Sequence, residues 1–97
     1  MMRILITYDV STITKQGKRR LRRVARACKD YGKRVQFSVF ECDVNELEWS
    51  KLRRRLLSEY DQAEDSLRFY FLDQNAMNRT EHHGVREPID FDGPLIA

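Results

Sequence analysis

Residues 3–10 have the sequence Arg-Ile-Leu-Ile-Thr-Tyr-Asp-Val, a short run rich in the β-branched and aromatic side chains that favour a β-strand. Successive side chains of a strand point to opposite faces. Ile4, Ile6 and Tyr8 therefore share one face and are the candidates for burial. The pattern predicts an N-terminal strand over Arg3–Tyr8.

Two helices are predicted downstream of this strand. Thr14 is a suitable N-cap for the first helix, and Gly32 is a typical signal for its end. The second helix is expected to start at Asp43, which forms a capping-box pattern with Glu46, and to stop near Asp61. The apolar face of the first helix comprises Leu21, Val24, Ala25, Cys28 and Tyr31, and that of the second comprises Trp49, Leu52, Leu56 and Ala63.

Two further strands are expected, over Arg34–Cys42 and Ser66–Leu72, from their alternating side chains. With one more strand hidden near the middle, the order predicts an α+β fold, a ferredoxin-like βαββαβ sandwich with two helices on one face of a mostly antiparallel sheet. A chain of 97 residues has room for one such core. We assign residues 1–73 to this core domain. Residues 74–97 form a polar C-terminal arm with two short extended candidates, Glu81–Arg86 and Leu95–Ala97.

Apolar side chains are expected on both faces of the sheet. The face away from the helices would carry Leu5, Phe40, Cys42, Tyr70 and Leu72. A contiguous apolar face usually marks an interface, so we expect a homodimer packed through its sheets, with the arm as part of the interface. The alternative is that the arm folds back over the sheet of its own chain.

Several functional classes lack their sequence signatures. The four glycines are isolated, which excludes a P-loop and a dinucleotide-binding loop. Cys28 and Cys42 do not form a zinc-binding pattern, and the adjacent His82 and His83 would point to opposite sides of an extended arm. The longest apolar run is the four residues Phe69–Leu72, far too short for a membrane span. We expect a cytoplasmic protein that does not bind membranes.

Positive charge is concentrated in the first helix and just after it. Residues 15–34 contain ten Lys or Arg and one acid, Asp30, so this segment has a formal charge of +9 in a chain of net charge +3. One stripe with 4-3-4-3 spacing contains Lys15, Arg19, Arg22, Arg26 and Lys29, and Arg20 and Arg23 lie on another flank. Such a helix could be only a solvated face. Because like charges along one stripe repel each other, a phosphate backbone is the better explanation.

Asp9 ends the first strand, where a rigid backbone can hold a carboxylate at a cleft. A strand-end Asp is usually a turn former or cap. Mg²⁺, however, is commonly held by one or two carboxylates together with waters and substrate phosphates. One Asp9 per chain would provide two carboxylates in a dimer whose axis passes nearby.

Several strings, taken in order, resemble the CRISPR-associated protein 2 family. They are Tyr8-Asp9-Val10, the Arg-rich first helix, Tyr31-Gly32, Arg34-Val35-Gln36 leading into Ser38-Val39-Phe40-Glu41, and the strand Leu67–Leu72. The resemblance covers residues 2–73. It implies a ferredoxin-like homodimer in which the two Asp9 side chains approach the two-fold axis and share one Mg²⁺. It also implies that the C-terminal arm crosses to the sheet of the partner.

The same resemblance implies the activity. Family members are described as metal-dependent endonucleases acting on RNA or double-stranded DNA, and as the central dimer that scaffolds the adaptation integrase during spacer acquisition. The matching motif makes Tyr8, Arg34, Ser38 and Phe40 site residues beside Asp9. It also implies one arginine of the first helix, for which Arg20, Arg22 and Arg23 are equal candidates.

Two functions of different class therefore stay open. The chain could be a hydrolase, or a non-catalytic architectural subunit that binds DNA. No general base is evident near Asp9, because the other acids are distant in sequence. The attacking water of a hydrolase would then have to be activated by the metal.

Overall fold

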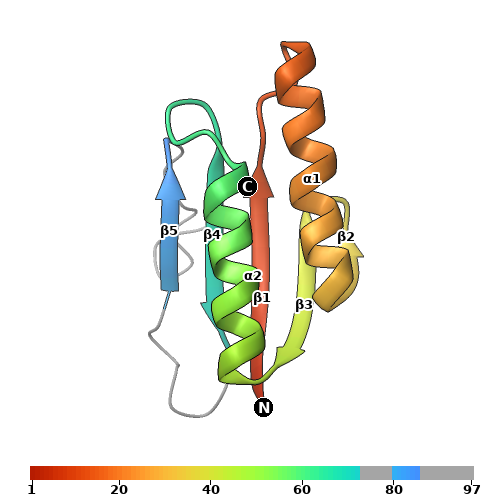
Figure 1. Ribbon diagram of the computed structural model, residues 1–97, viewed down its shortest axis with the longest axis vertical. Helices are drawn as coiled ribbons and strands as arrows, with labels where there is room; N and C mark the ends of the chain where they lie inside the picture. Colours follow the sequence, from red (N-terminus) through yellow and green to blue (C-terminus); the bar gives the residue numbers. More distant parts are fainter. Residues whose placement is uncertain (73–79, 86–97) are drawn as a thin grey trace, which may run out of the picture.

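The computed structural model describes residues 1–72 and 80–85, which form two helices and five strands (Figure 1). Along the chain these are β1 (Met2–Asp9), α1 (Lys15–Tyr31), β2 (Gly32–Gln36), β3 (Val39–Val44), α2 (Glu46–Glu59), β4 (Ser66–Phe71) and β5 (Thr80–Gly84). The strands form one sheet in the order β2-β3-β1-β4-β5, and every pair of neighbours is antiparallel. The predicted α+β class and its βαββαβ-like order are therefore confirmed.

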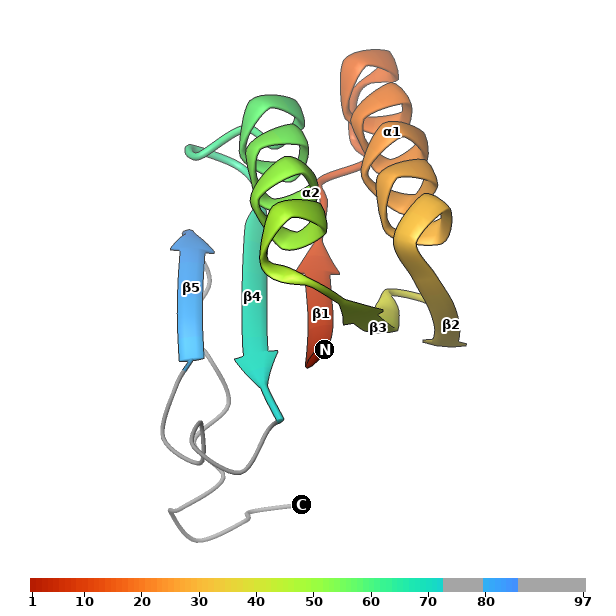
Figure 2. The ribbon, with the colours of Figure 1, turned by 60° about the horizontal axis from the view of Figure 1, so that its bottom comes forward.

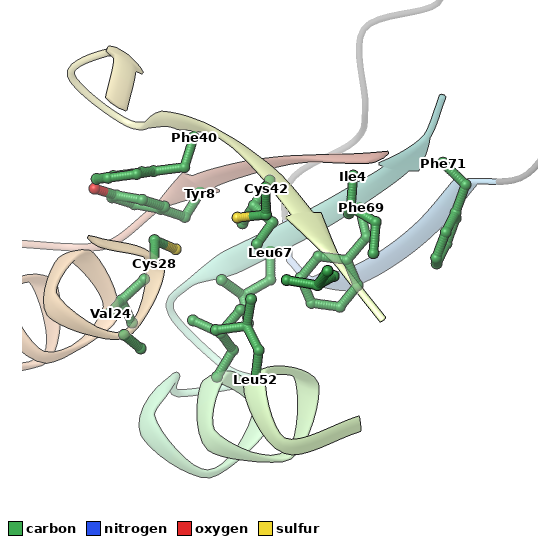
Figure 3. Packing of buried hydrophobic residues seen from close by; sticks show 14 of the residues in the cluster. Ile4, Tyr8, Val24, Cys28, Phe40, Cys42, Leu52, Leu67, Phe69 and Phe71 are labelled. Carbon is green, nitrogen blue, oxygen red and sulfur yellow. The ribbon is translucent and has the colours of Figure 1, made fainter. Parts of the chain in front are cut away.

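Both helices lie on the same face of the sheet (Figure 2). The core forms between the two layers, where alternate residues of the central strands point towards the helices (Figure 3). Its fully buried members include Ile4, Ile6, Val24, Phe40, Cys42, Leu52, Leu56, Leu67 and Phe69. In the described part of the chain, neither helix is long and apolar enough to cross a bilayer.

The first helix follows its predicted limits. The Thr14 hydroxyl accepts a hydrogen bond from the Gly17 amide at 3.0 Å, which is the expected N-cap contact. Gly32 is the C-cap. Val24 and Cys28 are buried as predicted, but Ala27 also faces the core, which the predicted stripe omitted.

The single strand predicted over Arg34–Cys42 is wrong, because the segment is a hairpin. β2 and β3 pair on either side of a tight turn at Phe37 and Ser38. No non-glycine residue among those described has a positive φ. The turn therefore needs no Gly or Asn, and it leaves no turn signature in the sequence.

The predicted cap of the second helix is displaced by two residues. β3 continues through the buried Val44, and Asn45 forms the capping box with Glu48. Asp43 instead accepts hydrogen bonds from the guanidinium of Arg3 on the neighbouring strand, at 2.9 and 3.2 Å. The helix ends at Glu59, near its predicted limit, so Ala63 lies in an exposed turn beyond its apolar face.

The prediction of a broadly apolar open face is also wrong in part. Phe40 and Cys42 pair with Ile6 and Ile4 in the register of β1 and β3, and all four side chains point into the core. Side chains on opposing residues of a ladder share one face. The hidden turn caused the error, because it separates the two strands that the prediction joined.

The C-terminal arm is described only in part. Thr80–Gly84 pairs antiparallel with β4 of the same chain, in a register from Tyr70↔Thr80 to Ser66↔Gly84. The first extended candidate is thus a strand at the edge of the sheet. Residues 86–97 lie outside the described residues, as does the candidate Leu95–Ala97. The crossing of the arm to a partner, and its part in an interface, stay predictions.

Candidate functional site

An open hollow of about 430 Å³ lies where β1 ends beside α1 and the hairpin turn. It is lined by Tyr8, Asp9, Val10, Leu21, Arg22, Ala25, Arg34, Phe37 and Ser38. The fold therefore brings together four of the five predicted catalytic residues and one arginine of the first helix. These residues come from three separate segments of the chain.

Tyr8 fixes the hairpin turn against β1. Its amide donates a hydrogen bond to the carbonyl oxygen of Ser38 at 3.1 Å, and its hydroxyl donates to the carbonyl oxygen of Phe37 at 3.2 Å. Burial raises the pKa of the Tyr8 hydroxyl, and the nearby Arg34 opposes that shift. Tyr8 is therefore a neutral donor that holds the wall of the hollow.

Phe40 is the fifth predicted catalytic residue, and it supports the hollow from behind. Its ring stacks on that of Tyr8, with centroids 6.2 Å apart and an interplanar angle of 22° (Figure 3). The guanidinium carbon of Arg34 lies 5.0 Å from the centroid of the Phe40 ring. A cation over an aromatic face is held in place electrostatically. Phe40 is fully buried, so its contribution is to position Tyr8 and Arg34.

Asp9 is the acidic group of the hollow. It is the last residue of β1, it pairs with Ser66 in the register of β4, and its side chain is exposed. Among the described residues, no three His, Cys, Asp or Glu side chains cluster closely enough to hold a metal by themselves. A single carboxylate still suits Mg²⁺, which takes its remaining oxygens from water and phosphate. The donor set thus fits a magnesium site that needs a substrate or a second chain to complete it.

The basic stripe of α1 is exposed along its whole length. Its members are Lys15, Arg19, Arg22, Arg26 and Lys29, and none forms an ion pair with a described residue. Arg22 also lines the hollow, so one member of the stripe borders the same hollow as Asp9. A row of cations that has no ion-pair partners among the described residues, beside a carboxylate, is suited to a polyanionic ligand.

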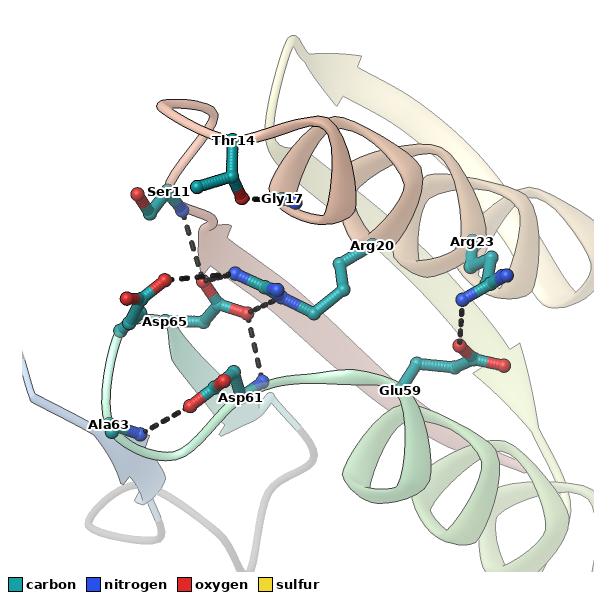
Figure 4. A network of polar contacts seen from close by, with 10 residues as sticks. Ser11, Thr14, Gly17, Arg20, Arg23, Glu59, Asp61, Ala63 and Asp65 are labelled. Atoms are coloured by element: carbon teal, nitrogen blue, oxygen red, sulfur yellow. Dashed lines mark hydrogen bonds and ion pairs between the residues drawn. The ribbon is translucent and has the colours of Figure 1, made fainter.

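The other flank of α1 differs from this stripe. The Nε atom of Arg20 lies 2.8 Å from a carboxylate oxygen of Asp65, and its side chain is only 14% exposed (Figure 4). Arg23 lies 3.9 Å from Glu59 of α2. The structure therefore places Arg22, of the three arginines that the sequence left open, at the hollow.

Sequence reasoning missed two residues. Phe37 lines the hollow and is 92% exposed. The alternating sequence predicts a strand at this position, so Phe37 could not be recognised as a turn residue. Asp65 is fully buried, and its sequence neighbourhood carries no sign of its partners. An acid immediately before a strongly predicted strand was the one available signal.

Comparison with known proteins identifies close relatives. Residues 2–80 match the family model described as CRISPR associated protein Cas2. The chain is 58% identical over 95 residues to a Chlorobaculum tepidum protein named CRISPR-associated endoribonuclease Cas2, covering 98% of this chain and 99% of that one. A Halalkalibacterium halodurans protein named CRISPR-associated endonuclease Cas2 is 48% identical over 95 residues, with coverage of 98% and 99%. The crystal structure of Streptococcus pyogenes Cas2 at pH 6.5 matches with a TM-score of 0.69 and 51% identity, covering 76% of this chain and 89% of that chain.

Proposed function

Because this chain belongs to the Cas2 family of CRISPR-associated proteins, we propose that it is an endonuclease that hydrolyses phosphodiester bonds in RNA or double-stranded DNA. The names of its relatives support this class of reaction, since they include both endoribonuclease and endonuclease. The observation that carries the proposal is the position of Asp9 in a hollow flanked by the basic stripe of α1. A carboxylate and a row of cations are the two parts that a phosphodiester site requires.

The active form in this proposal is a homodimer in which two Asp9 side chains share one Mg²⁺. Support comes from the donor count, because the described residues of one chain offer a single carboxylate at the hollow and no metal-binding cluster. A two-fold axis near Asp9 would supply the second carboxylate. When bound, the metal would supply an activated water and would stabilise negative charge on the phosphate.

The residues around Asp9 have distinct tasks in this reaction. Arg22 and Arg34 line the hollow and would orient the phosphate through charge-assisted hydrogen bonds. Tyr8 and Ser38 hold the hairpin turn against the end of β1, and Phe40 holds the Arg34 guanidinium. The remaining stripe residues would bind the nucleic acid backbone on either side without reading its sequence.

A second candidate is an architectural dimer that binds DNA and scaffolds the adaptation integrase without cutting. The exposed stripe of α1 favours it, because five cations without ion-pair partners among the described residues are more than positioning one scissile phosphate needs. The two roles are compatible in one protein. They differ in whether Asp9 is required for function.

Cleavage of a labelled duplex and a labelled RNA in Mg²⁺ tests the catalytic role. Asp9→Ala should abolish cleavage and leave binding intact. The matched control is Asp43→Asn, which removes an exposed carboxylate from β3 of the same sheet. Asp43 pairs with Arg3 near the start of β1, about 20 Å from Asp9 along the strand. Equal cleavage by wild type and Asp9→Ala would leave the architectural role as the function.

A further inference from the structure

Asp65 is the one buried carboxylate among the residues that the structure describes. It lies in the turn before β4, and donors surround its two oxygens (Figure 4). Oδ1 accepts a hydrogen bond from the Ser11 amide at 3.0 Å. Oδ2 accepts from the Asp61 amide at 2.8 Å and from Nε of Arg20 at 2.8 Å. We call this set of contacts the Asp65 network.

The carboxylate of Asp65 is held in its ionised form. Burial by itself raises the pKa of Asp65, but the hydrogen bonds from Arg20, Asp61 and Ser11 outweigh that effect and leave the pKa below its ordinary value. A buried charge is tolerated only when good donors surround it. The network therefore has a definite geometry, because the loss of any donor would leave the buried charge less well compensated and would destabilise the fold.

The network converges on the segment that carries Asp9. Ser11, whose amide is held by Asp65, lies two residues after Asp9. Ser66, the residue next to Asp65, pairs with Asp9 in the register of β1 and β4. Asp65 is thus connected to the backbone around Asp9 in two ways. Its neighbour Ser66 pairs with Asp9 across the sheet, and its side chain binds the amide of Ser11, just after Asp9.

Two close glycine contacts surround the same segment. A Cβ atom on Gly17 would collide with the carbonyl oxygen of Ser11, so α1 packs directly on the backbone that Asp65 holds. A Cβ atom on Gly84 would collide with the carbonyl oxygen of Asp65, and φ of Gly84 is 112°. Any side chain at either position would displace the end of β1 or the Asp65 network.

The network also relates Asp9 to the basic helix. Arg20 belongs to α1, one residue after Arg19 and two before Arg22. Its ion pair with Asp65 therefore fixes the position of the exposed stripe relative to the end of β1. The side chain of Arg20 is 14% exposed and that of Asp65 is fully buried, so solvent screens this pair less than a surface pair.

We propose that Asp65 is a positioning residue for the nuclease site: through Ser11 and Arg20 it holds the Asp9 carboxylate and the phosphate-binding stripe of α1 in one fixed arrangement. This inference rests on the proposed function for its catalytic consequence. Its structural content, the ordering of residues 9–11, stands independently and can be measured without substrate.

The test uses Asp65→Asn, which keeps the side-chain shape but replaces one accepting oxygen with a donor. Ile4→Val is the matched control, because it trims a fully buried side chain at the other end of β1 without touching the network. Amide exchange and ¹⁵N relaxation of residues 9–11 are measured first, followed by a Mg²⁺ titration of the Asp9 resonances and the kinetics of duplex cleavage. Arg20→Lys, which keeps the charge but not the guanidinium fork, replaces Asp65→Asn if the latter does not fold.

Asp65→Asn should raise the exchange rate of the Ser11 amide by about 10- to 100-fold, the range for losing one hydrogen bond to a charged group. Order parameters of residues 9–11 should fall from about 0.85 towards 0.6. The Mg²⁺ concentration at the titration midpoint should rise and kcat should fall, while KM for the duplex stays near the wild-type value. Exchange and order parameters equal to those of Ile4→Val would overturn the proposal. A wild-type protein that neither responds to Mg²⁺ nor cleaves would refute the nuclease function instead, and the NMR data would then decide the positioning role alone.

Discussion

Salt-dependent binding of a DNA duplex gives a quantitative test of the basic stripe. The change is Arg19→Gln with Arg22→Gln, two exposed residues of α1 three positions apart. The control is Lys51→Gln with Arg54→Gln, two exposed residues of α2 at the same spacing. Both double variants lower the formal net charge from +3 to +1, so only the place of the lost charges differs.

The expected magnitude follows from the number of phosphate contacts. The five stripe residues span about 21 Å at 1.5 Å per residue, long enough for each to reach a different phosphate. Each contact contributes about −0.9 to the slope of log K against log salt, so five contacts give about −4.5 and three give about −2.7. Between 50 and 200 mM salt, affinity should fall about 500-fold for wild type and the control, but about 40-fold for the α1 variant.

Fluorescence anisotropy of a labelled duplex of arbitrary sequence, measured at four or more salt concentrations, gives these slopes directly. Circular dichroism of each variant confirms that α1 and α2 are intact, because all four substituted side chains are exposed. Parallel slopes for the α1 variant and wild type would refute the assignment of phosphate contacts to the stripe. A flatter slope in the α2 variant alone would move the binding surface to the other helix.

Three further predictions concern stability and reactivity. The pKa of Asp65 is lower in the folded state than its ordinary value. The ionised carboxylate therefore stabilises the fold at pH values above the ordinary pKa, and this stabilisation is lost as the pH falls through the folded-state pKa. The difference in Tm between wild type and Asp65→Asn should shrink from pH 7 to pH 3. Phe37→Ser should change the free energy of unfolding by less than about 0.5 kcal/mol, because the side chain is 92% exposed, whereas Leu56→Ala in the core should cost about 2–5 kcal/mol in urea denaturation. Burial raises the pKa of the Cys28 thiol to about 12. At pH 8 the thiolate fraction of Cys28 should therefore be about a thousandfold lower than that of a cysteine with an unshifted pKa, and a thiol reagent should label it slowly. Labelling of the folded protein as fast as that of the unfolded chain would contradict the burial of Cys28.

The sequence was sufficient wherever a pattern of neighbouring residues determines the structure. The alternation in β1 and β4 and the Thr14 and Gly32 signals of α1 each depend on residues within one element, and the structure confirms them. A further strand near the middle was expected, but the turn between β2 and β3 was not located, because this turn at Phe37 uses only negative φ values. Without that turn, the faces of Phe40 and Cys42 could not be assigned.

The candidate site likewise contains one residue that the sequence could predict and one that it could not. Asp9 could be predicted because a carboxylate directly follows a hydrophobic strand. Asp65 could not, because its partners Arg20 and Ser11 lie 45 and 54 positions away along the chain. Contacts of that separation depend on the tertiary fold, and no local periodicity encodes them.

The proposed active form is a dimer in which the two Asp9 side chains act together in one Mg²⁺-dependent site. Wild-type and Asp9→Ala chains are unfolded, mixed in equal amounts and refolded so that subunits pair at random, and duplex cleavage in Mg²⁺ is measured at constant total protein. A shared site predicts about one quarter of the wild-type rate, since only dimers with two intact Asp9 residues are active. A rate of about one half would show that each chain acts with its own Asp9, and an undiminished rate would show that Asp9 takes no part in cleavage.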